Sequence, residues 1–489
     1  MMSNDDNSYK SIIRNMSKIG IAQIANTLFS ILKGKFAALF LGSYGMGIMS
    51  LLISQLDLIK SLTGFGLEIS AVKRISEISK ESKDIRGNEI KHIRFLFIIS
   101  GLIGAVTSFI FADLFSHWSF NNEEYVYAFR FFSITIFFYA LFAGNITVMR
   151  GLGLVTKLVK TSILTSFMSM LISSFLFFYY KTQGIVVSMV VVPIISYIIS
   201  ECYLSKKVSN EISLKFKYLK KESISLLAMG VVITIGTIIG SFVKLGVNVY
   251  IGRIGSISDV GFFTAAVTIG IQYVKILSAS LSDDYYPRLS KINRDINKVN
   301  KLLNKQLTLS VLIIAPLIIF AMLTAPIIIE IFLSKEFDLI VDLVRYISLG
   351  TLFQIISYNL GYISLAKQDK KFYLLTEVVI SNILLAFFSL LFYYLFGLNG
   401  LGIAYISLYI VYLIIITILN YKRYRVRIEK KLMFHFSIAL ILTVLSFIFF
   451  ILVSFQLNVV VVILLFILQL CYSLYFLNRY FNFMSLLKY

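Results

Sequence analysis

Long apolar segments separated by short polar stretches make up almost the whole chain. About 20 apolar residues in a helix are enough to cross the ~30 Å hydrocarbon core of a bilayer. On this criterion the pattern predicts an all-α polytopic membrane protein with about fourteen transmembrane helices. We expect these helices at residues 17–41, 46–70, 94–116, 127–149, 158–180, 184–204, 223–251, 259–282, 306–333, 341–366, 373–396, 400–420, 434–454 and 458–478.

The composition agrees with a membrane protein, since 58% of the residues are hydrophobic and 15% are charged, against about 25% charged in soluble domains. The net charge of +21 would suit nucleic acid, but the bases lie in short loops between apolar segments, which favours a membrane instead. We therefore expect no nucleic-acid partner. The three histidines are scattered, the two cysteines lie far apart, and no phosphate-binding glycine loop is present. We expect no metal, no cofactor and no enzymatic activity.

The bases are sorted between alternate loops. Basic loops occupy residues 73–94, 150–160, 206–221, 288–305, 367–371 and 422–431, whereas loops such as 42–45 and 397–399 are short and uncharged. Because lysine and arginine are enriched in cytoplasmic loops, both termini are predicted to be cytoplasmic. No loop is long enough to form a separate soluble domain.

A weak internal repeat runs through the chain, with matched positions between 210 and 216 residues apart. The matched pairs include Gly42 with Gly252, Lys60 with Lys275, Arg74 with Arg288, and Gly184 with Gly400. An even number of helices in each unit makes such a repeat parallel, with its axis along the membrane normal. The pattern predicts two six-helix lobes at 1–205 and 206–421, followed by two additional helices at 422–489.

Five lysines fall inside the predicted helices and are the main candidates for function: Lys33, Lys35, Lys60, Lys244 and Lys275. Charges inside a membrane are costly and usually face a wet interior. Lys35 and Lys244 lie close enough to the outer surface that they could instead extend to it. The match across the repeat favours a shared central cavity that binds an anion.

Acidic residues are fewer. Asp57 precedes Lys60 by three residues, so the two side chains share a helix face. One interpretation is an ion pair that makes Lys60 less costly to bury; the other is coupling to a proton or sodium ion. Glu68 and Glu377 lie nearer the cytoplasmic interface, where we expect both to be solvated.

Short motifs then suggest a family. The lysine-bearing first helix, the turn Phe40-Leu41-Gly42, the stretch Gly64-Phe65-Gly66-Leu67 before Lys73-Arg74, and the loop Arg150-Gly151-Leu152-Gly153 resemble the Wzx-type O-antigen and polysaccharide flippases. These belong to the superfamily (MOP) of the MATE exporters and the lipid II flippases. Many relatives have twelve helices, and a count of fourteen is closer to the lipid II flippases.

This resemblance implies alternating access between two lobes in the bacterial cytoplasmic (inner) membrane. It implies as substrate an undecaprenyl-pyrophosphate-linked oligosaccharide, such as an O-antigen repeat unit, and so a role in lipopolysaccharide biosynthesis or polysaccharide export. The lysines could bind the negatively charged head group. The expected partners are this lipid-linked oligosaccharide, membrane lipids and a coupling proton or sodium ion, and the protein is expected to be a monomer that can associate with polysaccharide assembly proteins.

Two other functions stay open at this point. A MATE-type multidrug exporter would bind organic cations, for which acidic or aromatic residues are suited, and the surplus of base counts against it. A polytopic glycan polymerase or ligase would carry a sizeable outer loop with acidic, arginine or histidine residues, and the outer loops here are too short.

Overall fold

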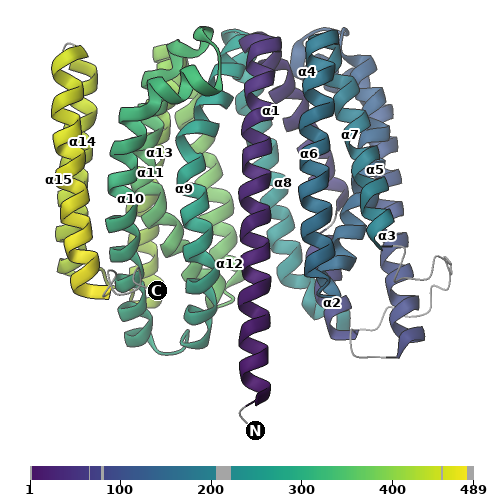
Figure 1. Ribbon diagram of the computed structural model, residues 1–489, viewed down its shortest axis with the longest axis horizontal. Coiled ribbons are helices and arrows are strands. Elements are labelled where there is room, and N and C mark those ends of the chain that lie inside the picture. The colour runs from purple at the N-terminus through teal and green to yellow at the C-terminus, as the bar shows by residue number, and fades with distance from the viewer. Residues whose placement is uncertain (1–2, 65, 79–81, 205–221, 453–454, 482–489) are drawn as a thin grey trace. The chain divides into compact units, whose positions relative to one another are not determined.

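The chain folds into α-helices, and its described part contains no β-strand. The computed structural model describes residues 3–64, 66–78, 82–204, 222–452 and 455–481, except for the side chains of 3–17, 83–84, 222–232, 273, 275–283, 452, 455–458 and 481. The helices divide by their contacts into two units, Met1–Arg253 and Ile254–Tyr489. The predicted fold class, a polytopic all-α membrane protein, is confirmed (Figure 1).

Unit 1 is built from long helices with two shorter ones at their ends. Its elements are α1 (Ser3–Gly64), α2 (Leu67–Glu77), α3 (Lys83–Ile110), α4 (Ala112–Phe120), α5 (Val126–Gly151), α6 (Val155–Tyr180), α7 (Gln183–Leu204) and α8 (Glu222–Ile254). At one end, Ile75 of α2 packs with Phe97 of α3 and Val148 of α5. Within this unit, the first turns of α1 extend beyond the end of α6 (Figure 1).

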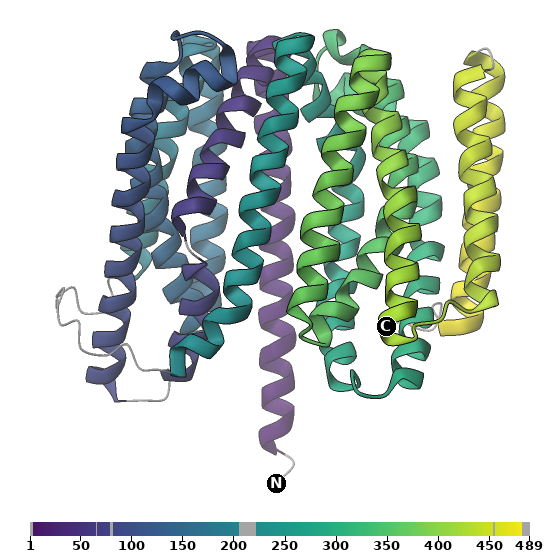
Figure 2. The ribbon, with the colours of Figure 1, turned by 180° about the vertical axis from the view of Figure 1, so that it is seen from behind.

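Unit 2 contains the remaining elements. These are α9 (Ile257–Lys291), α10 (Ile296–Phe332), the 3-10 helix η2 (Lys335–Ile340), α11 (Val341–Ala366), α12 (Lys370–Tyr373), the π-helix η3 (Leu374–Ile380), α13 (Ser381–Tyr424), α14 (Lys430–Leu452) and α15 (Phe455–Phe481). Buried side chains of α9, α10, α11 and α13 form its core, including Leu307, Leu360 and Tyr412. The pair α14–α15 packs against α10, and both views show it at one side of unit 2 (Figure 1 and Figure 2).

Two helices each hold two of the predicted spans. Helix α1 changes direction at Gly42 (φ 64°, ψ −169°), and α13 does so at Gly397 (φ 60°, ψ −141°). A positive φ is readily reached by glycine because it has no Cβ. Eleven helices of the described residues are long and apolar enough to cross a membrane, and α9 contributes a shorter apolar stretch, Ile257–Gln272. With both bent helices counted twice, these segments correspond to the predicted spans.

The C-terminal end of α5 has the same pattern of backbone hydrogen bonds as the C-terminal end of α11, 215 residues later. In α5 the N–H of Gly153 donates to Arg150 O and that of Leu154 to Met149 O. At the end of α11, the N–H of Gln368 donates to Leu365 O and that of Asp369 to Ser364 O. Gly153 and Gln368 both have positive φ, 65° and 55°. This correspondence supports the predicted internal repeat.

The lobe limits 1–205, 206–421 and 422–489 stay a prediction. The contact-based boundary lies later, after Arg253. Hydrogen bonds join α8 to α1 and α4 of unit 1. Arg253 Nη2 donates to the carbonyl oxygen of His117 at 2.9 Å and to that of Trp118 at 2.7 Å. Residues 205–221, which include the whole of the predicted basic loop 206–221, lie outside the described residues.

Candidate functional site

Three of the predicted site residues meet in unit 1. The Asp57 carboxylate of α1 lies between two lysines: its Oδ1 is 3.2 Å from Lys60 Nζ, and its Oδ2 is 4.0 Å from Lys244 Nζ of α8. Asp57 and Lys60 share a helix face because they are three residues apart. The cluster carries one net positive charge when all three groups are ionised.

Helix α8 is held against α1 one turn away from this cluster. The Asn248 side chain donates from Nδ2 to Ser54 Oγ at 2.9 Å and to Ser50 Oγ at 3.4 Å. All three side chains are buried. Buried polar groups need such partners, so these bonds fix the rotation of both helices. They therefore position Lys244 beside Asp57.

Lys60 also lines a pocket of about 440 Å³ within unit 1. Its ammonium lies 4.1 Å from the centre of the Tyr139 ring of α5, a cation–π contact. The wall also contains Asp57, Glu68, Thr237 and Ser241. Two acids and one base line this pocket, so it is mixed in charge rather than uniformly basic. Glu68 is exposed, in line with a solvated position.

Lys33 occupies a second pocket of unit 1, of about 310 Å³, between the first part of α1 and helices α5, α6 and α7. Its Nζ donates to Ser169 Oγ of α6 at 3.1 Å. Asn26, about two turns earlier in the helix, donates to Ser162 Oγ at 2.6 Å. Its buried Oδ1 has no hydrogen-bond partner in the described part of the chain. The described wall of this pocket is rich in hydroxyls, with Ser30 and Ser196 among them, and contains no acid.

Of the other two predicted lysines, Lys35 is not among the described residues that line either pocket. Lys35 is partly buried and makes no hydrogen bond or ion pair with the described residues. Positions two apart on a helix do not face the same way, so Lys35 is directed away from Lys33. Lys275 lies in α9, and its side chain is outside the described residues.

A polar group in unit 2 was missed by sequence reasoning. Glu377 of the π-helix η3, expected to be solvated, is partly buried, and its Oε1 accepts a hydrogen bond from Tyr412 OH at 2.6 Å. Gly361 of α11 lies so close that a β-carbon there would clash with the Glu377 carboxylate. Nearby, the amide of Gln354 donates to Tyr358 OH and Tyr409 OH at 3.0 and 2.7 Å. No signal of this contact lies in the sequence, because Gly361 and Glu377 lie on different helices and the sequence does not show which side chains face each other.

Comparison with known proteins places the chain in a family. The sequence model of a family described as "Polysaccharide biosynthesis protein" matches residues 38–342. No curated protein matches the chain in sequence.

Solved structures show the same fold over most of the chain. A lipid II flippase, MurJ, in its inward closed conformation has a TM-score of 0.71 at 15% identity, covering 96% of this chain and 99% of that one. An inward-facing multidrug resistance MATE family transporter of the MOP superfamily has a TM-score of 0.63 at 16% identity, covering 84% and 98%. A MOP superfamily transporter from Pyrococcus furiosus, described as having a binding pocket of reverse polarity, has a TM-score of 0.60 at 14% identity, covering 85% and 95%.

Proposed function

The chain belongs to the polysaccharide biosynthesis protein family, and from this premise we propose that it is a flippase for a lipid-linked oligosaccharide. The substrate we propose is an undecaprenyl-pyrophosphate-linked repeat unit, such as an O-antigen unit. It would be moved from the cytoplasmic to the outer leaflet of a bacterial inner membrane by alternating access. The fold shared with a lipid II flippase supports this class of cargo.

The observation that carries the proposal is the pocket around Lys33. An ammonium group without an acidic partner in the described part of the chain attracts an anion such as a pyrophosphate. The hydroxyls and the amide around it can exchange hydrogen bonds with sugar hydroxyls or phosphate oxygens. A membrane-embedded lysine costs several kcal/mol unless water or a partner relieves it, which makes a structural role alone a poor explanation.

Asp57, Lys60 and Lys244 form the second element of the proposed site. The two lysines would attract the head group. While no head group is bound, the Asp57 carboxylate would hold the two ammonium groups together. Lys35 and Lys275 remain proposed head-group ligands. Asp57 also remains the candidate for coupling to a proton or sodium ion.

The test is a complementation assay for the surface glycan in cells that lack this protein. Lys33→Ala should reduce export at least tenfold while the amount of protein in the membrane stays unchanged, because one charge-assisted contact is worth about 1.5–3 kcal/mol. Lys33→Arg should keep part of the activity, since the charge remains but the geometry differs. Lys160→Ala is the matched control, because Lys160 is an exposed lysine of α6 outside both pockets. Full export by Lys33→Ala would refute the head-group role.

One observation favours a second function, export of organic cations. Asp57 and Glu68 both line the 440 Å³ pocket, and an aromatic ring, Tyr139, lies beside them. Acidic and aromatic groups of this kind suit a cation. A deletion strain with increased drug sensitivity and normal surface glycan would move the protein to that class.

A further inference from the structure

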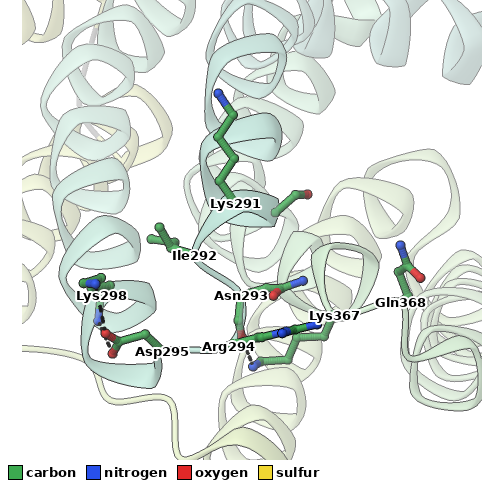
Figure 3. A pocket seen from close by; sticks show the side chains of 9 residues that line it. Lys291, Ile292, Asn293, Arg294, Asp295, Lys298, Lys367 and Gln368 are labelled. Carbon is green, nitrogen blue, oxygen red and sulfur yellow. Dashed lines mark hydrogen bonds and ion pairs between the residues drawn. The ribbon is translucent and has the colours of Figure 1, made fainter.

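A basic pocket lies in unit 2, at the end of the helices predicted to face the cytoplasm. It has a volume of about 900 Å³ and is formed by the connection from α9 to α10 and by the end of α11. Four bases line it, Lys291, Arg294, Lys298 and Lys367, against one acid, Asp295. Figure 3 shows Arg294 and Lys367 close together, with Lys291 extending away from them.

Two hydrogen bonds hold the walls of this pocket in place. The Asn293 side chain donates from Nδ2 to the carbonyl oxygen of Ala366 at 2.7 Å, and Lys367 Nζ donates to the carbonyl oxygen of Asn293 at 2.5 Å. The bonds run in opposite directions between the same two segments. They tie the α9–α10 connection to the end of α11, so the basic side chains project from a fixed backbone.

The acid in the pocket is already engaged. Asp295 Oδ1 accepts from the N–H groups of Asn297 and Lys298, at 3.0 and 3.2 Å, and caps α10. Its Oδ2 pairs with Lys298 at 3.4 Å. These contacts, the backbone N–H of Lys298 foremost, lower the pKa of Asp295 and keep it ionised. Asp295 therefore balances Lys298 and leaves the other bases without a counter-charge.

Those remaining bases lack acidic partners. Within the described residues, Lys291 and Arg294 make no ion pair, and Lys367 contacts a neutral carbonyl oxygen. Burial lowers the pKa of Lys367, the direction expected where no anion offsets the loss of water. Three positive charges around one pocket repel each other, and a bound anion would relieve that repulsion.

We propose that this pocket binds the phosphate group of an anion at the membrane surface. The guanidinium of Arg294 can donate two parallel hydrogen bonds to phosphate oxygens, and Lys367 adds a point charge beside it. A basic pocket at the cytoplasmic leaflet is where an anionic phospholipid head group would be attracted. A free phosphate or pyrophosphate offers the same chemistry. The site shares no lining residue with the pockets of unit 1, and the proposal does not depend on what the protein transports.

The experiment compares the two phosphate sources on the purified full chain. In one arm, the protein is placed in nanodiscs of phosphatidylcholine with or without phosphatidylglycerol, and the binding of phosphatidylglycerol is measured. In the other arm, inorganic pyrophosphate is titrated onto the protein in neutral detergent. We expect Arg294→Gln, which breaks no contact in the described structure, to weaken binding of the phosphate source about tenfold. The double variant Arg294→Gln, Lys367→Ala should weaken it further.

The matched control is the double variant Lys370→Ala, Lys371→Ala, which removes two exposed bases next to the pocket but not in its wall. It should change affinity less than twofold. A loss confined to phosphatidylglycerol would identify a lipid head group, and a loss confined to pyrophosphate would identify a free anion. Equal binding by the wild type, Arg294→Gln and the double variant in both arms would overturn the proposal.

Discussion

Lys181 and Gly397 adopt nearly the same backbone conformation at turns that lie 216 residues apart. Lys181 has φ 50° and ψ −131°, and Gly397 has φ 60° and ψ −141°. Three residues after each comes a glycine, Gly184 or Gly400, where an added β-carbon would clash with a carbonyl oxygen of the helical segment before the turn. The two halves of the chain therefore make the same tight helix–helix turn, once with glycine and once with lysine at its strained position.

Replacing Lys181 by glycine should stabilise the protein. A side chain in this region of φ and ψ costs about 1–3 kcal/mol, and glycine removes that cost. We expect a higher Tm for Lys181→Gly in detergent. Lys181→Ala is the control, because it keeps the strain and removes the ammonium that lies 5.7 Å from the Phe40 ring. A Tm for Lys181→Gly at or below that of Lys181→Ala would show that the turn is not strained.

Asp57→Asn separates the two roles considered for that carboxylate. Because Asp57 lies between Lys60 and Lys244, we expect it to act mainly as their counter-charge. Its loss should then tighten binding of the anionic substrate several-fold and leave the dependence of transport on an ion gradient unchanged. Transport in proteoliposomes, with and without proton and sodium gradients, measures both. If the variant loses its gradient dependence, Asp57 is instead the coupling residue.

The hydrogen bond between Tyr412 and Glu377 should stabilise the folded state of unit 2. Tyr412→Phe removes the hydroxyl that donates to the Glu377 carboxylate and leaves that acceptor unpaired, at a cost of about 1–3 kcal/mol. In Glu377→Gln the same hydroxyl can still donate to the amide oxygen, so the loss should be smaller. Thermal unfolding of the wild type and of the two single variants measures both losses. A loss for Glu377→Gln as large as that for Tyr412→Phe would contradict this account.

Asp369 should make stability depend on pH at the end of α11. Burial acts to raise the pKa of Asp369, but hydrogen bonds from the Phe372 N–H, Tyr424 OH and Arg423 outweigh it and lower this pKa. A lowered pKa in the folded state stabilises the protein above the ordinary carboxyl pKa of about 3.9, and this stabilisation is lost as the pH falls through the folded value. Asp369→Asn should thus lower the free energy of unfolding at pH 7 by about 1 kcal/mol, and by less near pH 3. The Tm measured at the two values of pH should fall accordingly. An equal loss at both values of pH would exclude the ionised carboxylate as its cause.

The spanning segments could be predicted from sequence because about 20 apolar residues are a sufficient condition for crossing a bilayer. The pairing of Asp57 with Lys60 could also be predicted, since three-residue spacing fixes it. The contact of Asp57 with Lys244 could not, because it depends on how α8 is rotated against α1, which Asn248 determines through Ser50 and Ser54.

Lys33 could be identified as a candidate from its depth in the first helix, but the side chains around it could not be predicted. Ser169, its hydrogen-bond partner, lies 136 residues away on α6, and serines in an apolar helix give no signal of which neighbour they face. The expectation that Glu377 is solvated was wrong for a related reason. It rests on the distance of Glu377 along the chain from the cytoplasmic end of its helix, whereas the π-helical turn around Glu377 changes the direction of its side chain.

That π-helix also affects how this chain can be aligned with its relatives. The N–H of Ser381 donates to Thr376 O, five residues back instead of four, so the turn holds one residue more than an α-helical turn. A relative with an uninterrupted α-helix here would match the chain on both sides of residues 374–380 only if one residue is treated as an insertion. Without that gap, every position of α13 would be compared with a neighbour about 100° around the helix, and lipid-facing residues would be equated with buried ones.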